Sequence, residues 1–254
     1  MNNKEKVEKL FTRVFFNLIR NHSNTTSFRR LSSIGKPTII SKLQAENSDF
    51  AYALFNNPEY EKLFLDQSST LTYLGGLSGV ESSITSNQIS TFDMTIDATS
   101  IVFMHSALDA AVTDLCYLTA KVSPDDWFKY MKRKKASLEE VKDNIFQKVY
   151  IEKLDEHLQK IDRESLTDRT SILFALCKPP ANFFIKQSYN FKKSELEKID
   201  NIRHEIVHGT GSLSSIKNVK KKIDYLFYTG LHLWGMVNEK YDVKINQMYM
   251  FNTE

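Results

Sequence analysis

Apolar residues recur every three or four positions along most of the chain, which is the spacing of one face of an α-helix. No convincing run of alternating strands and helices appears, and no internal repeat is present. The chain is therefore predicted to be all-α, with its second half forming a helical bundle. The predicted helices cover residues 4–20, 48–66, 93–121, 137–161, 167–177, 193–208 and 216–240.

Two polar segments interrupt this helical pattern and indicate how the chain is organised. Residues 21–36 are rich in Asn, Ser, Thr and Arg and run into Gly35-Lys36-Pro37, which predicts a loop. Residues 67–91 are rich in Ser, Thr and Gly, which favours a domain boundary or a surface excursion. We therefore expect an additional, mainly helical N-terminal region at residues 1–91, whose role the sequence does not indicate, and a bundle at residues 92–254.

Residue types that favour helix ends mark some of the predicted boundaries. Ser137, with Glu140 three positions later, has the spacing of a capping box at the start of one helix. Ser194 is the expected N-cap of the helix at 193–208, and Gly209 is expected to end that helix. Both ends of the helix at 193–208 thus carry a signal in the sequence.

The composition is that of an ordinary folded protein and excludes little. Of 254 residues, 41% are hydrophobic and 26% are charged, and the net charge of +3 permits nucleic-acid binding without requiring it. Cys116 and Cys177 are too few and too far apart for a disulfide framework or a Cys-x-x-Cys metal site, so we expect two buried, reduced thiols. The first residues lack the apolar stretch of a signal peptide, and no apolar run is expected to be long enough to cross a bilayer. We therefore expect a soluble, cytoplasmic protein without a membrane partner.

The stretch from Arg203 to Gly209 carries the most information, because it fits two different chemistries. From His204 it spells His-Glu-x-x-His, which on a helix places two imidazoles one turn apart, as in zinc hydrolases. The third ligand of one such group would fall at Ser214, and Glu239 stands too far along the final helix to match the other common arrangement. Gly209 also ends the helix where a zinc-ligand helix usually continues. We therefore expect no metal or other cofactor, and a zinc metallohydrolase stays as an alternative.

The same residues also read as an arginine, a polar residue, three further residues and a histidine at the helix end. In this pattern, residues 196–209 resemble the signature helix of the HEPN superfamily (higher eukaryotes and prokaryotes nucleotide-binding), with Arg203, His204 and His208 at the signature positions. The helix around His105 resembles the first long bundle helix of that superfamily. The chain departs from some toxins of the superfamily, because Gly-Thr follows the final histidine where they carry a tyrosine.

The resemblance implies a metal-independent endoribonuclease that acts as a homodimer, with two signature helices meeting at a composite site. Cutting RNA by attack of the 2′-OH needs a base, an acid and a cation beside the phosphate, and histidine and arginine supply these near neutral pH. Arg203 and His208 are the expected catalytic residues, and His204 is expected to orient the arginine. Ile206 and Val207 are expected to pack into the bundle. The implied setting is a prokaryotic toxin or antiviral (antiphage) defence system, with RNA as partner and an antitoxin or sensor protein as a further candidate.

Weaker candidates lie outside the signature. His105 and Asp109, one helical turn apart, are candidates to line the cleft. Two basic clusters are candidates to guide an RNA backbone, and the one that follows the signature closely is favoured. The favoured cluster is Lys217, Lys220, Lys221 and Lys222, and the other is Lys129, Lys132, Arg133, Lys134 and Lys135.

Simpler interpretations of the same residues stay open on the sequence alone. His208 before a glycine suits a helix C-terminus for dipole reasons, and Arg203 fits a surface ion pair with Glu197 or Asp200. A run of lysines is usually a solvated face. If the signature is inactive, the chain is a catalytically silent HEPN module that binds RNA or a partner protein.

Overall fold

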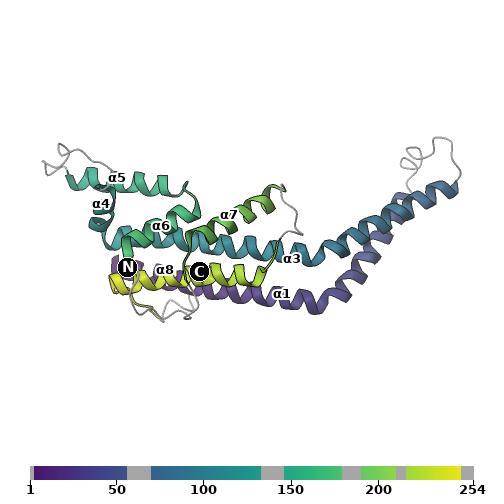
Figure 1. Ribbon diagram of the computed structural model, residues 1–254, viewed down its shortest axis with the longest axis horizontal. Coiled ribbons are helices and arrows are strands. Elements are labelled where there is room, and N and C mark those ends of the chain that lie inside the picture. The colour runs from purple at the N-terminus through teal and green to yellow at the C-terminus, as the bar shows by residue number, and fades with distance from the viewer. Residues whose placement is uncertain (1–2, 56–69, 133–145, 179–189, 210–215, 247–254) are drawn as a thin grey trace. The chain divides into compact units, whose positions relative to one another are not determined.

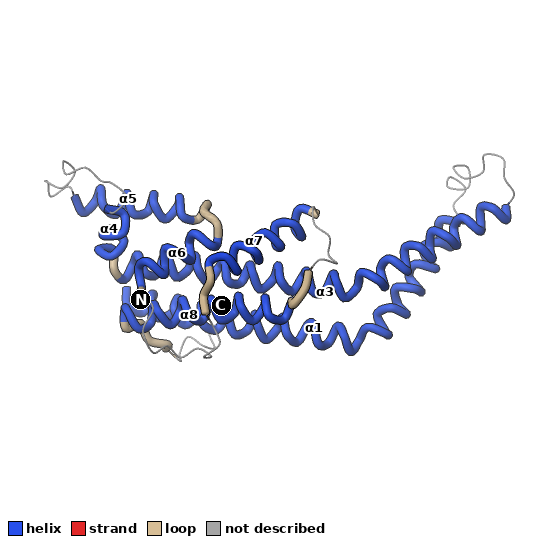
Figure 2. The backbone as a smooth tube through the Cα atoms, in the orientation of Figure 1, coloured by secondary structure: helices blue, strands red, loops and turns tan. Residues whose placement is uncertain are grey.

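The computed structural model describes residues 3–55, 70–132, 146–178, 190–209 and 216–246, and every regular element within them is an α-helix (Figures 1 and 2). The all-α fold class predicted from the sequence is therefore confirmed. In chain order the helices are α1 (Asn3–Phe55), α3 (Thr70–Val122), α4 (Pro124–Lys132), α5 (Phe146–Ile161), α6 (Leu166–Cys177), α7 (Lys193–His208) and α8 (Val219–Tyr241).

The helix that carries the signature is predicted most closely. α7 runs from Lys193 to His208, and Gly209 ends it in the left-handed conformation (φ 64°), donating its N–H to the carbonyls of Glu205 and Ile206. Glycine has no Cβ to clash in that conformation, which is why it is favoured there.

The predicted cap of α7 at Ser194 is wrong. The N-cap residue is Lys192, and it makes no side-chain capping bond. The hydroxyl of Tyr225 in α8 instead accepts a hydrogen bond from the backbone N–H of Lys192 (3.0 Å) and donates one to its carbonyl (2.8 Å). A side chain from another helix thus binds the backbone that a local serine was expected to cap.

The loop predicted at residues 21–36 is wrong as well, because this segment is helical within α1. One polar side chain of this segment bonds within the helix, because Thr25 Oγ1 donates to the carbonyl of Asn21 (2.7 Å), and others bind residues of α3 and α8. Pro37 also lies inside α1. Residues from 70 onward in the other predicted interruption are helical too, as part of α3. The capping box at Ser137 falls outside the described residues, as does the part of the predicted helix 48–66 that follows residue 55.

By contacts, the chain divides into two compact units. The bundle unit comprises residues 1–25, 100–212 and 217–254, and the hairpin unit comprises residues 26–99 and 213–216. α1 and α3 each run from one unit into the other, so the boundary predicted at residue 91 falls inside α3. The assignment of separate roles to 1–91 and 92–254 stays a prediction.

In the bundle unit, the first part of α1 runs antiparallel to α8. The ring of Phe11 stacks on that of Trp234 with centroids 4.6 Å apart, and farther along α1 the His22 imidazole contacts the Asp224 carboxylate (3.1 Å). Gly230 lies between these contacts, where the missing side chain lets the helices approach closely. A Cβ built there would stand 2.7 Å from a methyl of Leu18.

α3 supplies the central helix of this unit. Ile101, Met104 and Leu108 are fully buried along one face of it. The segment Thr91–Val122 has the length and composition of a membrane span (mean hydropathy 1.3), contrary to the expectation that no apolar run is long enough to cross a bilayer. Half of that window is buried inside the protein, and its apolar side chains form the bundle core.

In the hairpin unit, described contacts join the two long helices through ion pairs. Arg29 pairs with Asp97 (2.7 Å), and Lys36 pairs with Asp93 (2.6 Å). Increasing position in α1 thus meets decreasing position in α3, which makes this part an antiparallel helical hairpin.

Candidate functional site

The signature helix α7 is held against the bundle by its first half. Leu196 and Ile199 are buried, and α7 contacts α6. Towards the C-terminal end the helix becomes more open, because Ile206 is only half-buried and Val207 is 49% exposed. The expectation that Val207 packs into the bundle is therefore wrong, and the end of α7 is the part with free surface.

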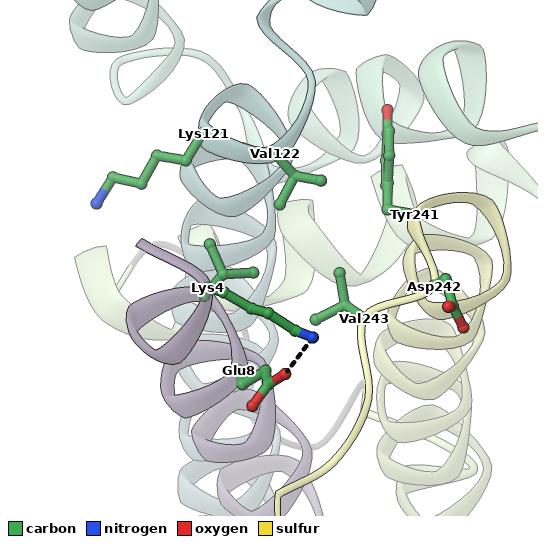
Figure 3. Close-up of a pocket in the computed structure, with 8 residues that line it drawn as sticks. Lys4, Glu8, Lys121, Val122, Tyr241, Asp242 and Val243 are labelled. Carbon is green, nitrogen blue, oxygen red and sulfur yellow. Dashed lines mark ion pairs between the residues drawn. The ribbon is translucent and has the colours of Figure 1, made fainter. Parts of the chain in front are cut away.

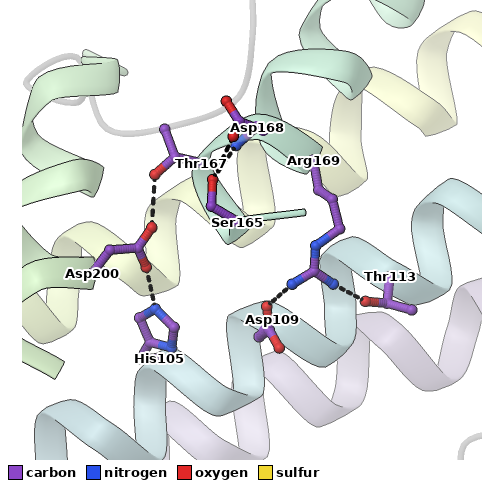
Figure 4. A network of polar contacts seen from close by, with 8 residues as sticks. All are labelled: His105, Asp109, Thr113, Ser165, Thr167, Asp168, Arg169 and Asp200. Carbon is purple, nitrogen blue, oxygen red and sulfur yellow. Dashed lines mark hydrogen bonds and ion pairs between the residues drawn. The ribbon is translucent and has the colours of Figure 1, made fainter. Parts of the chain in front are cut away.

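A polar network fixes α7 to α3 and α6 (Figure 4). Asp200 on α7 accepts a hydrogen bond from His105 Nε2 on α3 with one carboxylate oxygen and from Thr167 Oγ1 on α6 (2.8 Å) with the other. Burial acts to raise the pKa of Asp200, but the hydrogen bonds from His105 and Thr167 outweigh burial and hold that pKa below its usual value. Asp200 is therefore a charged anchor for the helix.

A second ion pair lies beside this network and joins α6 to α3. The guanidinium of Arg169, with only 7% of its side chain exposed, contacts Asp109 through one terminal nitrogen and Thr113 through the other. Its Nε is buried without a hydrogen-bond partner. Asp109 is 41% exposed, so water reaches one partner of the pair.

These two networks show where the weaker cleft candidates lie. His105 is only 7% exposed and is engaged by Asp200, and Asp109 is engaged by Arg169. Both side chains therefore have a structural role in joining helices. Neither pairing can be found from local sequence patterns, because the partners are 95 and 60 residues apart.

Arg203, one turn after Asp200, has no such partner. Its side chain is half-buried, and its Nε is buried without a hydrogen bond. The two carboxylates suggested as partners are engaged elsewhere, since Asp200 binds His105 and Glu197 pairs with Lys193 (3.8 Å). Within the described part of the chain, Arg203 is thus a guanidinium without a counter-charge.

His204 and His208 lie together on the exposed last turn of α7. Their ring centroids are 4.3 Å apart, with the ring planes inclined by 47°. The described residues give no contact between His204 and Arg203, so the expectation that His204 orients the arginine gains no support. The neighbour of His204 is His208.

Helix geometry separates the arginine from the second histidine. Arg203 and His208 are five positions apart, which at about 100° per residue places them roughly 140° apart around the axis. The two side chains therefore leave different sides of α7. Among the described residues, no group of three or more His, Cys, Asp or Glu could hold a metal ion, and Ser214 lies outside them.

The favoured lysine cluster begins α8. Lys217, Lys220 and Lys221 are exposed, whereas the Lys222 ammonium donates to the carbonyl of Lys217. The first turn of α8 has no acidic residue, and its N-cap Asn218 makes no side-chain capping bond. Positive charge at a helix N-terminus opposes the helix dipole. In the other cluster, Lys129 is exposed on α4, and residues 133–135 lie outside the described part.

A pocket of about 260 Å³ opens at another place in the bundle unit (Figure 3). Lysines and acidic residues share its wall, and Lys4 pairs with Glu8 (4.0 Å). Local sequence patterns do not indicate this pocket, because its wall comes from three segments that are distant along the chain. It is lined by Lys4, Val7, Glu8, Lys121, Val122, Tyr241, Asp242 and Val243.

The two cysteines are buried, as expected, and neither is in a disulfide. Burial raises the pKa of both Cys116 and Cys177 to about 12, so both are neutral thiols with little nucleophilic character at neutral pH.

Comparison of the chain with protein-family models, curated proteins and solved structures finds no match.

Proposed function

We propose that this protein is a metal-independent endoribonuclease of the HEPN kind. The observation that carries the proposal is the guanidinium of Arg203, which has no counter-charge among the described residues because Asp200 and Glu197 are engaged elsewhere. A half-buried cation without a counter-charge lowers the stability of the fold, and a bound anionic ligand would offset that cost. Its position in the Arg-polar-x3-His signature makes a phosphate the fitting ligand, because arginine binds phosphate oxygens in a bidentate fork.

The proposed reaction breaks one phosphodiester bond and needs no metal. The ribose 2′-oxygen attacks the adjacent phosphorus while an imidazole takes the 2′-OH proton. The bond from phosphorus to the 5′-oxygen breaks, and an imidazolium gives that oxygen its proton. The products are a 2′,3′-cyclic phosphate and a 5′-hydroxyl. Arg203 stabilises the charge that develops on the phosphate, and His208 is one of the proton carriers.

We further propose that the site is completed by a second copy of the chain. Arg203 and His208 leave α7 in different directions, so a two-fold axis beside α7 brings the arginine and histidines of both copies to one cleft. The exposure of Val207, 49% on the last turn of α7, supports this arrangement because a partner surface would cover it.

Lysines at the start of α8 are proposed to bind the RNA backbone. Lys220 and Lys221 are exposed at the positive end of the helix, where they lower its stability. An anionic partner offsets that repulsion. Changing both to glutamine is expected to weaken RNA binding. The slope of the logarithm of the binding constant against the logarithm of salt concentration should fall in magnitude by about two. Changing Lys121 and Lys160, two exposed lysines outside both clusters, to glutamine is the matched control, and an equal effect there would contradict this assignment.

By the same resemblance, we propose a cytoplasmic toxin or antiviral defence protein, held in check by an antitoxin or triggered by a sensor. Expression of the protein should then arrest growth, and an Arg203→Ala variant should relieve the arrest.

The test of the nuclease is cleavage of structured RNA in excess chelator by purified, untagged protein. Arg203→Ala and His208→Ala should each lower the rate on the order of a hundred- to ten-thousandfold. Arg163→Ala, which removes an exposed arginine in the turn before α6, should leave the rate unchanged. Parental cleavage by a folded Arg203→Ala or His208→Ala protein would place the active site elsewhere.

A second candidate is a catalytically silent module that binds RNA or a partner protein. The separation of Arg203 and His208 around α7 favours it if the chain stays monomeric, because one copy then does not bring the two together. RNA binding without cleavage by a monomeric protein, measured by sedimentation and gel shift, would select this candidate.

A further inference from the structure

The last turn of α7 presents two imidazoles side by side. The ring centroids of His204 and His208 are 4.3 Å apart, both residues are exposed, and neither ring makes a hydrogen bond or ion pair among the described residues. The ring nitrogens of both histidines are therefore not engaged by any described residue. The proposed nuclease uses His208 as a proton carrier and leaves this pairing of the rings unexplained.

We propose that His204 and His208 form a clamp for one divalent transition-metal ion taken up from solution, and that the bound ion shuts off the nuclease. The second half of this inference rests on the proposed function, and the first half does not. The ion meant is of the copper, nickel or zinc class, bound by two imidazole nitrogens and by water.

Geometry supports the clamp. Zn–N bonds of about 2.0–2.1 Å put two nitrogen ligands of one ion roughly 3 Å apart. Residues four apart on a helix lie on the same face, and a centroid separation of 4.3 Å leaves only a small side-chain rotation to bring one nitrogen of each ring to that spacing. In the single chain both histidines are exposed, which leaves room for water at the other coordination sites.

Electrostatics and ligand chemistry select the kind of ion. The pair stands on the last turn of α7, where the partial negative charge of the helix end favours a cation. Imidazole suits copper, nickel and zinc, whereas magnesium and calcium take oxygen ligands. Affinity should follow the usual order, with copper above both nickel and zinc.

The number of ligands makes the clamp a reversible inhibitory site. No third His, Cys, Asp or Glu joins the pair within the described residues, and structural or catalytic zinc needs three or four protein ligands. A loosely held ion exchanges with solution. While bound, it occupies one nitrogen of His208, so that nitrogen neither accepts nor donates a proton.

The direct test is titration of chelator-treated, untagged protein with CuCl2, followed by electron paramagnetic resonance. We expect one equivalent of Cu²⁺ with hyperfine splitting from two nitrogens. His204→Ala and His208→Ala should each lower the affinity at least about tenfold, since loss of an outer partner of a ligand already has that effect. Glu205→Gln, a change at the exposed residue beside His204, is the matched control and should bind like the parent.

Binding that is unchanged in both histidine variants, or a spectrum with one nitrogen, would overturn the clamp. Inhibition is then measured as the rate of RNA cleavage with and without CuCl2. MgCl2 is the control salt and is expected to leave the rate unchanged. Full cleavage by the copper-saturated protein would overturn the inhibitory role. A metal-free protein that cuts no RNA would refute the proposed nuclease and the inhibition together, while the binding result would still decide the clamp.

Discussion

Removal of Asp109 should destabilise the bundle unit more than removal of its buried partner. Asp109→Ala leaves the guanidinium of Arg169, 7% exposed, without its counter-charge. Breaking a buried ion pair from one side costs about 3–5 kcal/mol. Because Asp109 is itself 41% exposed, water already weakens the ion pair. We therefore expect Asp109→Ala to lower the free energy of unfolding by about 2–3 kcal/mol.

Arg169→Met should cost less, because methionine fills similar space and the aspartate left behind reaches water. We expect this change to lower the free energy of unfolding by about 0–1 kcal/mol, since replacing a buried ionic residue by an apolar one is often neutral. The Asp109→Ala/Arg169→Met double variant should then resemble Arg169→Met alone. The coupling between the two positions would then equal the loss in Asp109→Ala, about 2–3 kcal/mol, within the range for residues in contact.

Urea unfolding followed by tryptophan fluorescence measures this directly, because Trp127 and Trp234 both lie in the bundle unit. In a thermal unfolding experiment, the same loss of stability should lower the melting temperature of Asp109→Ala by about 4–10 °C. The stable double variant should also keep full RNA cleavage if Asp109 is structural. Additive losses in the double variant, or an Asp109→Ala protein as stable as the parent, would refute the reasoning.

Three further changes test other parts of the structure. Gly230→Val forces a side chain into a space where a Cβ alone meets Leu18 at 2.7 Å, and should cost about 1–3 kcal/mol in urea unfolding; an unchanged midpoint would mean the helices can move apart. Gly209→Ala places a Cβ in left-handed backbone with nothing within 4 Å, so backbone strain alone should lower stability by about 1 kcal/mol, and no loss would contradict that conformation. The pKa of Asp200 is lowered on folding, so its carboxylate stabilises the protein above the unfolded value of 3.8, and this contribution is lost as pH falls through the lower folded value. Asp200→Asn should therefore be less stable at pH 7 and should lose less stability than the parent between about pH 5 and pH 2; parallel pH profiles would show that Asp200 is not such an anchor.

The sequence predicts the helices whose signals are local. The bounds of α7 follow from its apolar spacing and Gly209, which act within the helix itself. Residues 21–36 mislead because Asn, Ser and Thr disfavour an isolated helix, whereas in the protein Arg29 and Lys36 join this segment to α3 by ion pairs. In this segment, ion pairs with another helix outweigh the low helix propensity of the residues.

In the candidate site, too, local features can be predicted from the sequence and long-range contacts cannot. The signature residues can be found by spacing, because Arg203, His204 and His208 belong to one helix. The pairing of His105 with Asp200 cannot, since it joins residues 95 positions apart and depends on how α3 and α7 pack. Long-range contacts of this kind determine which polar residues remain free for a ligand.

The pairing of α1 with α8 has a consequence for synthesis. Phe11 and Trp234 are separated by 223 positions, yet the Trp234 indole donates to the Phe11 carbonyl (3.2 Å) and stacks on its ring. At about 5–20 residues per second, the apolar face of α1 emerges from the ribosome roughly 10–45 s before its cover is made. The nascent chain therefore exposes Phe11 and Leu18 through most of translation, and the bundle closes only near the end.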